Sequence, residues 1–256
     1  MTLFSTILIV CGKVNFTNLS RYSELNEKTY RRQFSEEVDF GRLNGGLIQA
    51  AIPPSHEQLA VMDSSFLRKS GKATFGLDRY WNGCHSWVER GLEVSLVSLV
   101  DVETEVSYAL HAQQTFAQTE MAGVGRMDQY LGHLTLVRPQ LPATVQYLAV
   151  DGADAKERFV TGAVQFTGLS DCQARDLLKL DFHFNASFTA LNLAKFDAHH
   201  QHQGQEPFVF SMASAKRRAL NQHLLERFIA NLDLEPSVIK SHPNYSTLCD
   251  YGTIAA

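Results

Sequence analysis

The sequence predicts an α/β (α+β) chain in which a mixed sheet is flanked by helices, with a helical N-terminal region and a helical C-terminal tail. Three observations predict this architecture. Two hydrophobic runs, 59–63 and 145–151, each end on an aspartate. Between them lie a strand–turn–strand pattern and one helical stretch. Beyond them, apolar residues recur at intervals of three or four, which is the spacing of an amphipathic helix.

The bulk composition limits the classes of function. The chain has 256 residues, 45% of them hydrophobic, which allows one large domain or two small ones. A net charge of −4 argues against a generally basic nucleic-acid coat protein but is compatible with local basic patches. The four cysteines are far apart and indicate reduced thiols rather than a zinc site. The apolar start is too short for a membrane span and lacks signal-peptide features, so we expect a cytoplasmic protein without membrane association.

Residues 1–45 are predicted to be helical and to form a helix-turn-helix-like DNA-binding region. The apolar start is expected to be a helix belonging to a core whose earlier part is absent. Either Ser23 or Asn26 can cap a second helix further on. A short helix, a polar break and a basic helix are what a helix-turn-helix reader needs, and the alternative is an amphipathic helix that only faces water. The exposed side of the basic helix carries Lys28, Arg31 and Arg32.

Residues 46–164 are strand-rich and are predicted to form the first part of the core. Residues 92–100 have the β-branched content of a buried strand, 101–105 supply a turn, and 106–113 return as a second strand. The acidic residues of that turn, Asp101, Glu103 and Glu105, are interpreted as hairpin formers.

A helix is expected over 127–136, before the strand into Asp151 and a further helix over 153–160. The order strand, hairpin, helix, strand, helix is that of the RNase-H-like fold, whose first and fourth strands carry neighbouring acidic ligands. Asp63 and Asp151 then stand at strand ends on one rim of the sheet. There they can hold Mg²⁺ or Mn²⁺ for phosphoryl transfer.

Residues 165–256 are predicted to be helical. One helix is indicated by apolar residues from Leu177 to Leu191, and a second by those from Leu220 to Leu232, ending before Pro236. A polar run rich in histidine and glutamine, 197–206, is expected to link them as a solvated loop.

Longer motifs extend over nearly the whole chain. The stretches Met62–Gly71, Thr74–Asp78, Trp81–His85 and Gly91–Glu93 resemble bacterial insertion-sequence transposases of the DDE type. The lead-in 20–34, the pair Asp151–Gly152, and the later stretches 165–176 and 180–185 resemble the same family.

The resemblance implies a particular chemistry and set of partners. Asp63 and Asp151 match the first two catalytic acids of the family, which hold two metal ions, Mg²⁺ or Mn²⁺. The expected partners are DNA, as the terminal repeats of the element and the target, and a second transposase chain. Three basic residues after the first acid, Arg68, Lys69 and Lys72, can meet phosphates or form a solvated loop. Tyr80, Trp81 and Trp87 are expected to pack the following loop against the core, and stacking on an unpaired base is the alternative.

This sequence departs from the family pattern at the third catalytic acid. In the family a long insertion follows Asp-Gly and precedes the catalytic Glu, whereas here about a dozen residues separate Asp151 from Gln165. The chain therefore resembles an internally deleted copy, with a seam near Val164/Gln165 and an incomplete core. Replacement of the Glu by another acid, Glu157, Asp171 or Asp176, is expected to require a rearranged sheet.

Three functional hypotheses follow. The first is a DDE transposase performing metal-dependent DNA strand cleavage and transfer, impaired by loss of the Glu. The second is a non-catalytic DNA-binding remnant that titrates or inhibits intact transposase. The third is a decayed product whose uncovered sheet edge and apolar faces promote aggregation.

Overall fold

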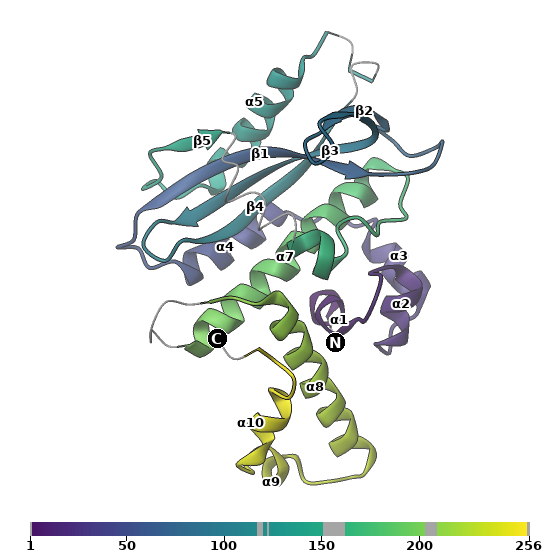
Figure 1. Ribbon diagram of the computed structural model, residues 1–256, viewed down its shortest axis with the longest axis vertical. Coiled ribbons are helices and arrows are strands. Elements are labelled where there is room, and N and C mark those ends of the chain that lie inside the picture. The colour runs from purple at the N-terminus through teal and green to yellow at the C-terminus, as the bar shows by residue number, and fades with distance from the viewer. Residues whose placement is uncertain (1, 117–119, 122, 151–161, 203–208, 255–256) are drawn as a thin grey trace.

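A mixed five-stranded sheet lies at the centre of the structure, with α5 on one face and α7 on the other (Figure 1). The structure is a computed structural model that describes residues 2–116, 120–121, 123–150, 162–202 and 209–254. The strands are β1 (Gln58–Arg68), β2 (Asp78–Asn82), β3 (Trp87–Asp101), β4 (Val106–Thr115) and β5 (Leu148–Val150). This arrangement confirms the predicted α+β class.

The strand order is β4–β3–β1–β5, with β2 beside the first residues of β3. Strands β1, β3 and β4 are antiparallel neighbours, as the predicted hairpin requires. Strand β5 runs parallel to β1, with Met62 opposite Val150. The two hydrophobic runs that the sequence singled out therefore lie side by side.

The helices outside the sheet differ in length and role. They are α1 (Leu3–Ile9), α2 (Phe16–Arg21), α3 (Glu27–Gln33), α4 (Phe40–Ala51), α5 (Arg126–Val137), α7 (Leu177–His202), α8 (Met212–Asn231), α9 (Pro236–Lys240) and α10 (Asn244–Cys249). Two short turns, η1 (Arg138–Gln140) and η2 (Ala163–Thr167), complete the described elements. No helix in this part of the chain is both long and apolar enough to cross a lipid bilayer.

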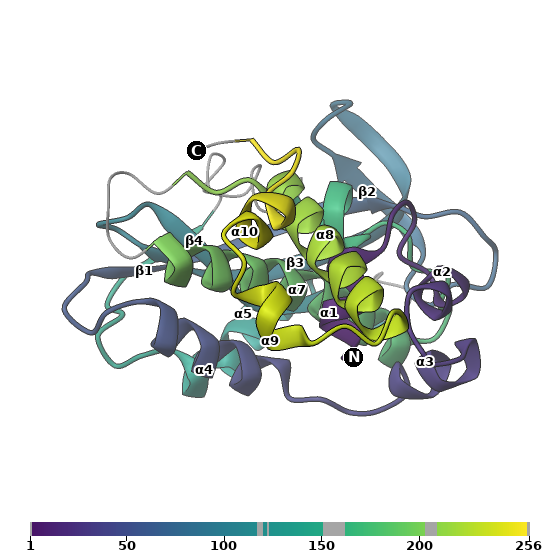
Figure 2. The ribbon, with the colours of Figure 1, turned by 90° about the horizontal axis from the view of Figure 1, so that it is seen from below.

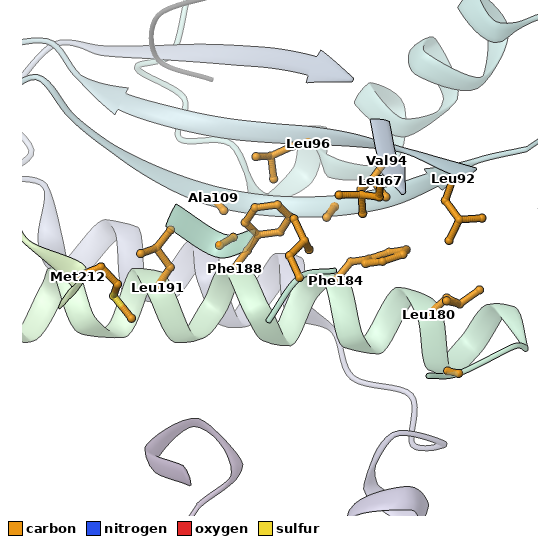
Figure 3. Packing of buried hydrophobic residues seen from close by; sticks show 14 of the residues in the cluster. Leu67, Leu92, Val94, Leu96, Ala109, Leu180, Phe184, Phe188, Leu191 and Met212 are labelled. Atoms are coloured by element: carbon orange, nitrogen blue, oxygen red, sulfur yellow. The ribbon is translucent and has the colours of Figure 1, made fainter. Parts of the chain in front are cut away.

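Alternation along β3 divides the core between the two faces of the sheet. Leu92, Val94 and Leu96 point toward α7 (Figure 3). Val97 and Leu99 lie in a second cluster with residues of α4 and α5. The apolar spacing of the tail is borne out, because α7 contributes to the first cluster with Leu180, Phe184, Phe188 and Leu191.

The N-terminal helices pack on a further side of α7, so this helix is buried almost all round. Phe182 of α7 stands 4.6 Å from Phe34, ring centre to ring centre. Helix α8 packs against α1 and α7 (Figure 2). Of the two candidate caps, Asn26 caps α3 by accepting the Thr29 N–H at 2.9 Å. Ser23 accepts a hydrogen bond from the Tyr30 hydroxyl instead.

The outer edge of β4 is covered by polar side chains of α7. Asn185 bonds both the N–H and the C=O of Ala112 at 2.8 Å each. Seven residues and two helical turns later, Asn192 does the same for Ala109, at 2.9 and 2.7 Å. The helix thus replaces a neighbouring strand, and this edge does not present the open template that promotes aggregation.

Two sequence predictions are wrong in the described region. Strand β1 does not end at Asp63 but continues to Arg68, because Ser64–Arg68 still pair with the long strand β3. Asp63 therefore lies mid-strand rather than at the rim of the sheet. The predicted linker also begins too early: α7 continues to His202, with Phe196 packed against the α4–α5 cluster. The helix expected over 153–160 lies outside the described residues.

Candidate nucleic-acid interface

Asp63 occupies the face of the sheet that α7 covers. Its Cα partner across the sheet is Leu96, which packs toward α7. The side chain is half-buried, and its Oδ1 accepts the Ser64 N–H at 2.6 Å. Asp151, which follows Val150 of the neighbouring strand, lies outside the described residues. The register brings β5 beside β1 as far as Met62 and Val150 but does not locate the second carboxylate.

The described residues do not supply the carboxylates that a Mg²⁺ or Mn²⁺ site of the family's type needs. In this part of the chain Asp63 belongs to no group of three side chains able to ligate one ion. Two suggested substitutes have other roles: Asp171 accepts the Val14 N–H at 2.8 Å, and Asp176 accepts the Lys179 N–H at 3.1 Å. The third, Glu157, is not among the described residues.

A different trio, His56, Asp101 and Glu103, has ligand atoms within 4.8 Å of one another. It lies beside Gln58, at the end of β1 remote from Arg68. The Asp101 carboxylate accepts the hydroxyl of Thr104 and the N–H of Glu103, and it stands 2.9 Å from His56 Nδ1. That hydrogen bond raises the pKa of His56. These contacts confirm the predicted hairpin turn.

The basic residues, in contrast, converge. A groove of about 1180 Å³ runs between α3, the loop 68–74 after β1, and the segment 170–179 that leads into α7. We call it the basic groove. It is lined by two carboxylates, Asp171 and Asp176, and by eight basic side chains: Lys13, Arg31, Arg32, Arg68, Lys69, Lys72, Arg175 and Lys179.

Five of the six basic residues singled out in the sequence line this groove, and the sixth does not. Lys28 is exposed on α3 but is absent from the lining. Sequence reasoning missed Lys13, Arg175 and Lys179. Lys179 lies in the first turn of α7, whereas Arg175 precedes the helix, so no helical spacing linked the two in the sequence.

Buried side chains of α3 determine which of its other residues face the groove. Tyr30 and Phe34 are buried under α3, which leaves Arg31 and Arg32 on the exposed side. Arg31 pairs with Glu27 and stands 5.0 Å from the centre of the Phe16 ring. These contacts hold the guanidinium at the mouth of the groove.

The loop 68–74 is fixed to the segment before α7. The Phe75 N–H donates to the Arg175 carbonyl at 2.8 Å, and Lys69 Nζ donates to the Cys172 carbonyl. This hydrogen bond links the two segments, and burial lowers the pKa of Lys69. Arg68 and Lys72 are exposed on either side of it.

The aromatic residues of the β2–β3 ribbon divide into two groups. Tyr80 is 1% exposed and donates to the Gly76 or Thr115 carbonyl, so its packing role is confirmed. The packing prediction is wrong for Trp81 and Trp87, which are 56% and 58% exposed. They lie where the ribbon extends past the last residue pair of β1 with β3.

Comparisons with protein-family models, curated protein sequences and solved structures found no match to this chain.

Proposed function

We propose that this chain is a DNA-binding protein derived from a DDE transposase, which holds phosphates in the basic groove and lacks strand-cleaving activity. The observation that carries the proposal is the groove itself. The chain as a whole has a net charge of −4, yet eight basic side chains and only two carboxylates line this one surface. Such local concentration of one charge favours a polyanionic partner.

The size of the groove favours an extended anion over a small one. Its volume of about 1180 Å³ exceeds the range of about 300–1,000 Å³ typical of small-molecule pockets. A nucleic acid gains affinity from each phosphate that a lysine or arginine neutralises, because counterions are released. Exposed Arg31 and Arg32 of α3 and exposed Arg68 at the end of β1 offer such contacts within one groove.

The ancestry part of the proposal is supported by topology and by the family resemblance together. A strand order of β4–β3–β1–β5, with β5 parallel to β1, is the order expected of an RNase-H-like core. The absence of a third acid beside Asp63 among the described residues favours binding over transposition. The covered edge of β4 argues against the hypothesis of a decayed product that cannot fold. A binder of this kind would titrate or inhibit intact transposase by occupying its DNA or by associating with it.

Neutralising the groove is expected to weaken binding to duplex DNA by at least about tenfold. In Arg32→Gln/Arg68→Gln/Lys72→Gln, the slope of log affinity against log salt should also fall by about 2–3, roughly one for each phosphate that is no longer neutralised. Fluorescence anisotropy with a labelled duplex between 50 and 200 mM salt measures both quantities.

The matched control is Arg42→Gln/Arg79→Gln/Arg138→Gln, which removes the same charge from exposed positions outside the groove. It should retain most of the affinity. Equal losses in the two triple variants, at unchanged melting temperature, would show that binding depends on net charge and would refute the role of the groove.

A second measurement separates binding from catalysis. We expect saturating Mn²⁺ to produce no increase in melting temperature that depends on Asp63. With an intact site, Mn²⁺ at a hundred times its dissociation constant would add about 2.7 kcal/mol, or about 5–11 °C for a chain of this size. Differential scanning fluorimetry of the wild type and Asp63→Asn tests this. A shift seen in the wild type alone would revive the catalytic hypothesis.

A further inference from the structure

The β2–β3 ribbon, residues 78–91, extends the sheet beyond its other strands. Strand β1 ends with Arg68 opposite Gly91, and the pairing of β4 with β3 reaches only as far as Glu93. From residue 90 back to residue 87, β3 therefore pairs with β2 alone. Residues opposite each other in the two strands share a face, and neighbours along a strand alternate between faces. The register thus assigns every side chain of the ribbon to one of two faces.

One face of the ribbon is held by contacts within the protein. It carries buried Tyr80 and, directly opposite, Glu89. The Glu89 carboxylate accepts hydrogen bonds from Asn82 Nδ2 at 3.0 Å and from Trp87 Nε1 at 2.7 Å. The other carboxylate of the ribbon, Asp78, is on this face too, two residues before Tyr80. The opposite face of the ribbon therefore carries no carboxylate.

That opposite face carries two arginines and an apolar pair. Arg79 is opposite Arg90, and Trp81 is opposite Val88. All four side chains are exposed. Like charges directly opposite each other destabilise a sheet, and no described side chain forms an ion pair with either guanidinium. An anion bound between the two arginines would remove their repulsion, so the charge of this face favours an anionic partner.

The arginine face begins beside the basic groove. Alternation along β3 places Arg90 on the same side of the sheet as Leu92, which packs toward α7 (Figure 3). Arg68, which lines the groove, is opposite Gly91 and thus next to Arg90. On the other strand, Thr74 lines the groove four residues before β2 begins. A nucleic-acid strand that leaves the groove at this end meets the arginine face of the ribbon.

We propose that this face binds one nucleotide of single-stranded DNA, with its base stacked on Trp81 and its phosphate between Arg79 and Arg90. The arginine pair lies two residues from Trp81, or about 7 Å along the ribbon, which is comparable to the distance between a phosphate and its own base. Guanidinium groups bind phosphate through paired hydrogen bonds, and an aromatic ring stacks on any base.

Trp81 favours unpaired DNA, because the bases of a closed duplex are stacked on one another. The inference rests on the proposed DNA binding and extends it from paired to unpaired DNA. Variants of the ribbon should therefore retain most of the affinity for duplex DNA, whereas variants of the basic groove should not.

The ribbon contains its own matched control. Trp81 and Trp87 are the two tryptophans of the chain, both are exposed, and they lie on opposite faces. We expect Trp81→Ala to weaken the binding of a labelled oligothymidylate of twelve nucleotides about tenfold, a loss typical of one base stacked on an aromatic ring. Trp87→Ala should retain most of the affinity. An abasic strand of the same length, which has the phosphates without the bases, should bind Trp81→Ala and the wild type equally. Fluorescence anisotropy measures all of these affinities.

Tryptophan emission reports the stacking directly. In Trp87→Phe the remaining tryptophan is Trp81, and oligothymidylate should quench its emission. In Trp81→Phe the remaining one is Trp87, whose emission should not change. The abasic strand should quench neither variant.

The arginine pair is tested by salt dependence. Arg79→Gln/Arg90→Gln should weaken the binding of both strands and reduce the slope of log affinity against log salt by about 0.7, the value for one phosphate on a single strand. Arg42→Gln/Arg138→Gln removes the same charge from exposed positions outside the ribbon and the groove, and it should leave the slope unchanged.

Three results would overturn the proposal. They are equal losses of oligothymidylate affinity in Trp81→Ala and Trp87→Ala at unchanged melting temperature, an equal loss for the abasic strand in Trp81→Ala, and unquenched Trp81 emission in Trp87→Phe. None of them bears on the basic groove, which is tested with duplex DNA. Conversely, if the groove variants bind duplex DNA like the wild type, quenching of Trp81 would still show that the ribbon binds a single strand.

Discussion

Replacing both Asn185 and Asn192 with alanine is expected to lower the free energy of unfolding by about 5 kcal/mol. Each asparagine pairs with one N–H and one C=O on the outer edge of β4, at Ala112 and Ala109. Both side chains are buried, at 2% and 0% exposure, so water cannot replace them. A buried polar group left without a partner costs about 1–3 kcal/mol, and four such groups are created. The loss is comparable to the whole stability of an ordinary domain.

Urea unfolding followed by circular dichroism measures this loss, and the two single variants should each show about half of it. Asp197→Ala is the matched control, because Asp197 is exposed on the same helix and its loss should cost less than about 0.5 kcal/mol. A double variant that loses less than about 1 kcal/mol would mean that α7 is not seated on β4. The groove would then lose its support, since Arg175 and Lys179 lie just before and within the first turn of this helix.

These asparagines also show which part of the fold could not be predicted from the sequence. The apolar spacing from Leu180 to Leu191 predicted α7 correctly, because periodicity is a local property of the chain. The same pattern does not single out Asn185 and Asn192. They are buried because β4, some 75 residues earlier, offers unpaired backbone groups at the matching spacing. A contact between distant segments leaves no trace in local periodicity.

The candidate site was predictable to a similar extent. The sequence assigned the basic residues of α3 to a helix-turn-helix-like region or a solvated helix, and those after the first acid to phosphate contacts or a solvated loop. Their convergence with Lys13, Arg175 and Lys179 required the fold, because the segments are separated by up to about 160 residues. Asp63 was assigned to a strand end because its hydrophobic run stops there, yet pairing with β3 carries the strand onward. Partner strands, rather than composition, decided where β1 ends.

Stability at acid pH is expected to depend on His133, which lies between α5 and the sheet. It is 1% exposed, with Ser95 Oγ 2.7 Å from its Nδ1 and His111 Nδ1 3.0 Å from its Nε2. Burial, and then the charge of His111, lowers the pKa of His133 to about 3. Burial lowers the pKa of His111 too, although the charge of the nearby Asp39 carboxylate acts to raise it. His133 is therefore not expected to be protonated in the folded protein at pH 5.

The sign of the effect follows from which state binds the proton. In the unfolded chain His133 has a pKa near 6.5. Between pH 6.5 and about 3, His133 therefore binds a proton in the unfolded chain but not in the folded one. Stability therefore falls as the pH falls through this window, by about 2 kcal/mol at pH 5 from His133 alone. Asp181 acts in the opposite direction, because burial raises its pKa to about 6 and the folded state then holds the extra proton.

Because these two groups oppose each other, the informative quantity is a difference between variants. Between pH 7 and pH 5, His133→Gln should lose about 2 kcal/mol less stability than the wild type, measured by urea unfolding at each pH. His223→Gln, at a half-buried histidine of α8, should follow the wild type. If His133→Gln shows the same pH dependence as the wild type, the imidazole is protonated within the fold. Both ring nitrogens of His133 would then donate, to Ser95 Oγ and to a neutral His111 Nδ1, and these two hydrogen bonds would compensate for the burial of the charge.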